Sequence, residues 1–261
     1  MFPQRIQAFN PGVLTGRGNN TYLLDDVLID AGVGAPAHLD ALTAALDGRP
    51  LAHVVVTHGH SDHASGVPGL RERWPDVRVS KYFPDGHVLP NWSALVEGDR
   101  VIVGDRFSGD LYALHVLVTP GHAVDHLCLF EPLSGDLYAG DMVIAGTTVL
   151  VPSRAKGGHM RSYLQSLARI RDLDPVRVLP GHGPVMERPR ERINAIIEHR
   201  LEREAQVVAC LAEGMTEPAL IVSRIYDNLA PGLLPFAEQT VIAHLEKIAE
   251  DRGESAERLR Q

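Results

Sequence analysis

An apolar segment that runs directly into a cluster of histidines is the feature that most constrains the fold of this chain. The segment Leu51–Thr57 is followed at once by His58-Gly59-His60-Ser61-Asp62-His63. Its valines predict a buried strand. Because alternate residues of an extended segment point the same way, His58 and His60 can share one ion, and a turn after them would direct Asp62 and His63 to a second. Imidazole and carboxylate donors suit zinc, with iron or manganese as alternatives.

Three further apolar runs end in the same way. Each is followed by a residue of a metal-ligating type that stands beside a glycine: Gly121-His122, Gly140-Asp141 and Gly181-His182-Gly183. Glycine permits the tight turn that such a position needs. A single buried histidine is usually an ordinary core residue, but four strand ends of this kind indicate a metal site.

The pattern of the chain changes after Pro184. Before it, short apolar runs predict strands at residues 21–24, 27–30, 51–57, 77–80, 100–103, 111–118, 127–130 and 137–139, with helices at 36–46 and 160–170. After it, a long helical pattern covers residues 188–213, and two shorter helices follow. The sequence therefore predicts an α/β domain over residues 1–186, with helices on the outer faces of its sheets, and a small helical domain over residues 187–261.

The order of the motifs, H-x-H-x-D-H, then G-H, G-D and G-H-G, resembles the metallo-β-lactamase superfamily over about residues 5–185. This resemblance implies an αββα sandwich with a two-metal site. By motif position, the first metal is expected on His58, His60 and His122, the second on Asp62, His63 and His182, with Asp141 as the bridge. Asp30 matches the aspartate of the family that orients a ligand histidine. His126, close to His122 in the sequence, is a further candidate to support the ligands.

Two divalent ions, expected to be zinc, can generate a hydroxide and polarise the bond that it attacks. Asp62 and Asp141 would support that hydroxide, so no serine or cysteine nucleophile is needed. The chain has no G-x-S-x-G elbow, no phosphate-binding G-x-x-x-x-G-K-[ST] loop and no dinucleotide fingerprint. These features predict a dinuclear metal-dependent hydrolase.

Three segments outside the metal motifs carry a narrower resemblance. Residues 9–12, 19–24 and 146–149, together with the helical tail, look like the β-lactamase-like protein 2 group. Members of that group carry a C-terminal winged-helix-like unit, and the animal member cleaves single-stranded RNA, so the resemblance implies an RNA phosphodiester substrate. Hydrolysis of a thioester, lactone or β-lactam on the same scaffold, as in glyoxalase II, is the alternative. A non-catalytic nucleic-acid-binding module is a remote third.

Charge gives the only other indication of substrate. Residues 142–171 contain no Asp or Glu, although the net charge of the chain is −8. Arg154, Lys156 and His159 lie in the centre of this stretch, so we expect them to bind an anionic substrate, either a small molecule or single-stranded RNA. The helical tail has balanced charges and is expected to cap the active site or to form a homodimer.

No apolar run approaches the roughly 18 residues of a membrane helix, and residues 1–5 lack the apolar stretch of a signal peptide. The two cysteines, Cys128 and Cys210, lie far apart in the chain. A cytoplasmic protein without a membrane partner is the expectation.

Overall fold

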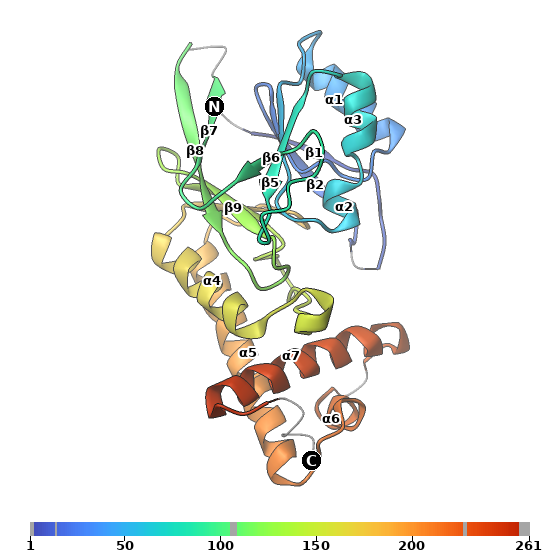
Figure 1. The fold of residues 1–261 in the computed structure, drawn as a ribbon, viewed down its shortest axis with the longest axis vertical. Coiled ribbons are helices and arrows are strands. Elements are labelled where there is room, and N and C mark those ends of the chain that lie inside the picture. The colour runs from blue at the N-terminus through green and yellow to red at the C-terminus, as the bar shows by residue number, and fades with distance from the viewer. Residues whose placement is uncertain (1–2, 14, 105–108, 227–228, 256–261) are drawn as a thin grey trace. The chain divides into compact units, whose positions relative to one another are not determined.

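The structure is a computed structural model that describes residues 3–13, 15–104, 109–226 and 229–255. The chain divides into two compact units. The first, here called the hydrolase body, comprises residues 1–119, 125–147 and 174–189; the second, the helical unit, comprises residues 120–124, 148–173 and 190–261. Both units are visible in Figure 1, where the colour runs from blue at the N-terminus to red at the C-terminus.

Two mixed sheets form the hydrolase body. The first contains β1 (Gln4–Gln7), β2 (Asn20–Leu24), β3 (Val27–Ile29), β4 (His53–Val55), β5 (Arg78–Tyr82) and β6 (Ser93–Leu95), in that order. The strands β1 to β3 are antiparallel, whereas β3 to β6 run parallel. Parallel pairing of β3 with β4 places their carboxyl ends at the same edge of the sheet.

The second sheet has the order β11–β10–β9–β8–β7. Its strands are β7 (Arg100–Gly104), β8 (Leu111–Val118), β9 (Leu127–Glu131), β10 (Asp136–Gly140) and β11 (Arg177–Pro180). The strands β7 to β10 form an antiparallel meander, and β11 runs parallel to β10. The carboxyl ends of β10 and β11 therefore also lie at one edge.

The core of the hydrolase body has two layers. Between the sheets, side chains such as Val55 and Ile29 pack with Val116 and Leu129. On the other face of the first sheet, a second cluster packs α1 (Pro36–Leu46) and α3 (Val67–Arg73) against strands such as β4. The short helix α2 (Ser61–Ala64) carries part of the histidine motif. The predicted helix at 36–46 and all eight predicted strands are present.

Helices make up the second unit. They are η1 (Arg154–Lys156), α4 (Met160–Leu173), α5 (Pro189–Ala212), α6 (Pro218–Ile225), η2 (Pro231–Leu233) and α7 (Leu234–Arg252). A separate apolar cluster joins α5, α6 and α7 through side chains such as Val207, Ile221 and Val241. The long helix predicted at 188–213 and the two shorter helices after it are present. Of the helices described, none is both long enough and apolar enough to cross a membrane.

Candidate metal centre

Four strands of the hydrolase body are followed closely by residues of the expected site. Asp30 follows β3, His58 follows β4, Asp141 follows β10 and His182 follows β11. In each pair of parallel strands, the two turns leave from the same edge. A backbone hydrogen bond of 2.7 Å from the Gly181 N–H to the carbonyl of Gly140 ties together the turns of the second sheet.

Asp141 lies between two histidines. Its Oδ1 is 3.4 Å from His63 Nε2, and its Oδ2 is 3.4 Å from His182 Nε2. Asp62 Oδ2 faces the same two nitrogens, at 3.7 Å from His63 and 3.4 Å from His182. Two carboxylates and two imidazoles thus converge on one small volume, and Asp141 presents one oxygen to each histidine.

His58 and His60 extend this group. The Nε2 atom of His58 is 2.9 Å from Nδ1 of His60, and the ring centroid of His58 is 4.2 Å from that of His63. Two sets of ligand-type atoms within the hydrolase body lie within 4.8 Å of one another: His58 with His63 and Asp141, and Asp62 with His63 and His182. Asp141 is therefore close to both halves of the histidine motif.

Asp30 fixes the orientation of the motif from behind. It adopts a left-handed backbone conformation with φ of 63°, which is uncommon for a residue other than glycine. Its carboxylate accepts a 2.8 Å hydrogen bond from His63 Nδ1 and further bonds from the backbone N–H and the hydroxyl of Thr57. The Thr57 oxygen is in turn 3.1 Å from Nδ1 of His58. One buried carboxylate thus orients His63 directly and His58 through Thr57.

His126 positions Asp141 through a hydrogen bond to its backbone. Its Nε2 accepts a hydrogen bond of 3.1 Å from the backbone N–H of Asp141. Because that nitrogen is an acceptor, its Nδ1 carries the proton and donates to the Thr119 hydroxyl at 2.9 Å. His126 is fully buried and acts on the position of Asp141 through the backbone.

Asn19 and Asn20 are part of the site that motif analysis did not assign. Asn19 Nδ2 donates to Asp62 Oδ2 at 3.1 Å. Asn20 Nδ2 donates to the carbonyls of Pro180 and Gly183 at 2.9 and 2.8 Å, on either side of His182. The only signal in the sequence was the pair of adjacent asparagines just before a predicted strand. In the structure both residues are buried, with 0% of Asn19 and 5% of Asn20 exposed.

The electrostatics of the site favour a cation. Burial by itself lowers the pKa of His63, but the carboxylates of Asp141 and Asp30 raise it well above its usual value. For His182, burial is likewise outweighed by Asp141 and Asp62, which raise its pKa to about 9. Burial raises the pKa of Asp141, yet His63 and His182 hold it well below its usual range. Without metal, protons on the imidazoles supply the positive charge that a divalent ion would supply on binding.

The residues fit a metal ion sterically and chemically. His63 Nε2 is buried and has no hydrogen-bond partner of normal length in the part of the chain that the structure describes. A Cβ atom at Gly181 would come within 2.7 Å of both Asp141 Oδ1 and His63 Cε1, so only glycine lets these two ligands approach. Imidazole and carboxylate donors are those of zinc, iron and manganese sites.

His122 belongs to the helical unit in the division described above. It is buried, and its Nδ1 donates to the carbonyl of Leu150 at 2.7 Å, which directs Nε2 away from that bond. The segment that carries it, residues 120–124, is flanked by Thr119 and Asp125 of the hydrolase body. Its role as a ligand beside His58 and His60 stays a prediction of the motif.

The three basic candidates of the sequence also lie in the helical unit. Arg154 pairs with Glu250 of α7, and its backbone N–H donates to Glu246 at 2.9 Å. His159 Nε2 is 3.1 Å from Glu250 Oε1. Lys156 is exposed on η1. The acidic partners of Arg154 and His159 come from a helix some 90 residues further along the chain.

Known proteins share both parts of this architecture. Residues 14–182 match the metallo-beta-lactamase superfamily, and residues 218–252 match the beta-lactamase associated winged helix domain. The chain is 30% identical to a beta-lactamase-like protein 2 homolog of Caenorhabditis elegans, over 80% of this chain and 70% of that protein. It is 32% identical to the atrochrysone carboxyl ACP thioesterase of Aspergillus fumigatus, over 79% of this chain and 64% of that protein.

A solved structure agrees with the sequence relatives. The beta-lactamase domain protein from Burkholderia ambifaria is 25% identical and superposes with a TM-score of 0.77, covering 96% of this chain and 86% of that one. These matches confirm the predicted family, the α/β fold and the C-terminal winged-helix domain. The chain belongs to the metallo-β-lactamase superfamily and is a metal-dependent hydrolase.

Proposed function

We propose that this chain hydrolyses an acyl thioester with two divalent metal ions, zinc in the first place and iron or manganese as alternatives. The observation that carries the metal part is the position of Asp141, whose carboxylate lies within 4.8 Å of ligand atoms of both His58 and His63, one histidine from each expected ligand set. A carboxylate that reaches donors of both sets is suited to bridge two ions.

The ligand sets follow from the contacts together with the family motif. His58, His60 and His122 would hold one ion, Asp62, His63 and His182 would hold the other, and Asp141 would touch both. His122 is included because the family motif has a ligand histidine at this position.

When bound, two such ions lower the pKa of a water molecule and polarise the carbonyl that it attacks. The protein supplies orientation. Asp30 keeps the proton of His63 on Nδ1 and so leaves Nε2 available as a donor to metal. Asn19 restrains Asp62, and His126 restrains the backbone of Asp141. These contacts pre-organise the site before substrate arrives.

Relatives named as thioesterases favour the acyl substrate. One of them is the Aspergillus fumigatus protein above. Such relatives matter here because the superfamily fold by itself does not determine the substrate. The RNA prediction rested on the family resemblance and on the acid-free stretch at 142–171, but two basic side chains of that stretch, Arg154 and His159, are engaged by Glu250. RNA therefore keeps only the support of the family resemblance.

A substrate panel on purified, zinc-loaded protein tests the proposal. It should contain butyryl-pantetheine, S-lactoylglutathione, a homoserine lactone, nitrocefin, bis(p-nitrophenyl) phosphate and single-stranded RNA. We expect the highest kcat/KM on a thioester, and the Asp141→Asn variant as the matched control should lose that activity while remaining folded by circular dichroism. Faster cleavage of RNA than of any thioester, lost in the same variant, would replace the thioester assignment.

A further inference from the structure

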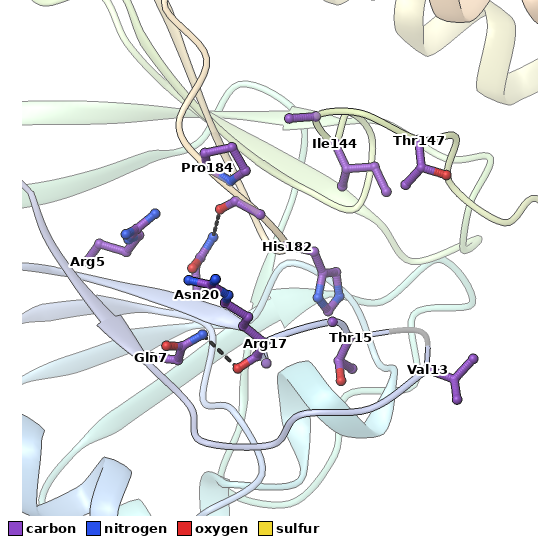
Figure 2. Close-up of a pocket in the computed structure, with 14 residues that line it drawn as sticks. Arg5, Gln7, Val13, Thr15, Arg17, Asn20, Ile144, Thr147, His182 and Pro184 are labelled. Atoms are coloured by element: carbon purple, nitrogen blue, oxygen red, sulfur yellow. Dashed lines mark hydrogen bonds between the residues drawn. The ribbon is translucent and has the colours of Figure 1, made fainter.

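A cavity of about 630 Å³ opens beside His182 in the hydrolase body. Its walls come from three separate parts of the body: the N-terminal segment from Arg5 to Asn20, the segment after Asp141 and the turn that carries His182. Figure 2 shows Arg5, Arg17 and His182 around this one pocket. A cavity of this size lies within the range of small-molecule sites.

The charge of the pocket is unusual for this chain. Arg5 and Arg17 line it, and no carboxylate does so among the described residues. Some arginines of the hydrolase body have acidic partners: Arg49 pairs with Asp25, and Arg177 pairs with Asp136 at 2.6 Å. Over the described ranges, Arg5 and Arg17 have no such partner, and both side chains are exposed. In a chain with a net charge of −8, two unpaired arginines on one pocket wall make a local attraction for anions.

Hydrogen bonds connect the backbone segment that carries these arginines to the turn that carries His182. Arg5 lies on β1 opposite Tyr22 of β2, and Gln7 Nε2 donates to the carbonyl of Arg17 at 2.7 Å. Asn20, at the start of β2, donates to the carbonyls on either side of His182, and its own N–H donates to Gly181 at 2.7 Å. The segment that carries the two arginines and the turn that carries His182 are therefore one connected unit.

The pocket also has an apolar lining. Ile144, Ala145 and Pro184 contribute to it. A ligand that fills this space needs an apolar or weakly polar body, with an anionic group where the guanidinium groups lie. Arginine recognises phosphate and carboxylate groups through paired N–H donors.

We propose that Arg5 and Arg17 form a binding subsite for an anionic group, a phosphate or a carboxylate, at the end of the acyl thioester remote from the scissile bond. This subsite rests on the proposed thioesterase function. The anionic group can belong to the thiol half of the substrate or to its acyl half, and substrates that differ by one charge separate these two sources.

Two substrate pairs test the subsite by kinetics. Butyryl-pantetheine and butyryl-4′-phosphopantetheine differ by a phosphate on the thiol half, whereas butyryl- and succinyl-N-acetylcysteamine differ by a carboxylate on the acyl half. In the wild type we expect KM to be at least about tenfold lower for the charged member of one pair, with kcat within about twofold. The double variant Arg5→Gln/Arg17→Gln should lose that preference and leave the neutral substrates unchanged.

Matched variants and a binding measurement complete the design. Arg17→Lys should keep most of the preference, and Arg100→Gln, which removes an exposed arginine of β7 outside the pocket, should keep all of it. Calorimetric titration with pantetheine against 4′-phosphopantetheine, and with butyramide against succinamate, measures binding to the subsite without turnover. It therefore separates a failed subsite from a failed thioesterase assignment. Equal binding of the charged and neutral members of both pairs, or a preference that survives in Arg5→Gln/Arg17→Gln, would overturn the proposal.

Discussion

Each of the two units contains a cluster of histidine and charged side chains, and the two clusters differ in charge balance. In the metal centre the carboxylates of Asp62 and Asp141 face imidazoles, which carry a charge only when they take up a proton. In the helical unit the carboxylates of Glu250 and Asp251 face the permanently charged Arg154 and Arg161. The first cluster lacks a permanent cation and the second does not.

This difference distinguishes a cluster that can bind a metal ion from a cluster that stabilises the fold. A buried group of acids whose only cations are displaceable protons can gain free energy from a divalent ion. A group of acids that already faces guanidinium ions gains little from a further cation and instead links α7 to the segment 154–161. The same comparison marks Arg5 and Arg17, which lack acidic partners in the described chain, as available to a ligand. Charge that is balanced by the protein indicates structure, and charge that is left unbalanced indicates a site.

The largest effect is expected from Asp141→Ala. This change removes the carboxylate that lies within 4.8 Å of both His58 and His63, one histidine from each expected ligand set, so we expect the variant to retain less than one metal ion per chain and to lose at least about a thousandfold in kcat/KM. Elemental analysis and thioester kinetics measure the two losses. Asp62→Ala is the informative comparison, because it should weaken mainly one ion; retention of both ions by Asp141→Ala would contradict the bridging role.

For a buried histidine without a carboxylate partner, we expect a pKa that is lowered, whereas that of His63 is raised. Burial lowers the pKa of His38 to about 4, and its Nε2 lies 2.9 Å from the Thr21 hydroxyl. Because the unfolded imidazole takes up a proton near pH 6.5 and the folded one does not, stability present at pH 7 is lost as the pH falls from 6.5 to 4, by about 3 kcal/mol. Urea unfolding at pH 7, 5 and 4 should show a weaker pH dependence for His38→Leu than for the wild type. Equal slopes for the two proteins would show that His38 is protonated in the folded state.

A smaller effect is expected in the helical unit. Glu250→Gln leaves Arg154 and Arg161 without their shared carboxylate, and we expect a loss of about 1 kcal/mol in the free energy of unfolding, because the pairs are partly exposed. Metal content and kcat should not change. Glu254→Gln, on an exposed residue just beyond α7, is the control for loss of one negative charge. A loss of activity without a loss of stability would instead connect this cluster to catalysis.

The smallest effect is expected from the double variant Arg154→Gln/Lys156→Gln. Since Glu250 already engages Arg154, KM for a charged thioester should change by less than about twofold, against at least about tenfold for Arg5→Gln/Arg17→Gln. Steady-state kinetics on the same substrate compare the two. A larger rise in KM for the first variant would return Arg154 and Lys156 to the substrate site that the sequence predicts.

Much of the fold could be predicted because it depends on local patterns. The helix at 36–46 and the strands that end at Asp30, His58 and Asp141 follow from apolar runs and the turn residues beside them. β1 and β6 were missed, because β1 is mostly exposed and its hydrogen-bond partners in β2 lie 13 or more residues away. Because β1 was not predicted, the place of Arg5 on this strand was not predicted either.

The site was harder to predict wherever its contacts are long-range. The motif indicates the metal ligands, since each follows its own strand. Nothing local shows that Asn20 binds the turn around His182, or that Glu250 neutralises Arg154. An acid-free stretch of sequence therefore gave a misleading picture of free positive charge, because its counter-charges come from a distant helix.

Metal titration of the stripped protein shows whether hydrolysis depends on two bound ions. The protein is freed of metal with a chelator, dialysed, and assayed on butyryl-pantetheine after each addition of zinc. We expect no hydrolysis at the start, a rise with added zinc and a plateau at about two equivalents per chain. Full hydrolysis by the stripped protein, or a rate that zinc, iron and manganese all leave unchanged, would contradict hydrolysis by two metal ions.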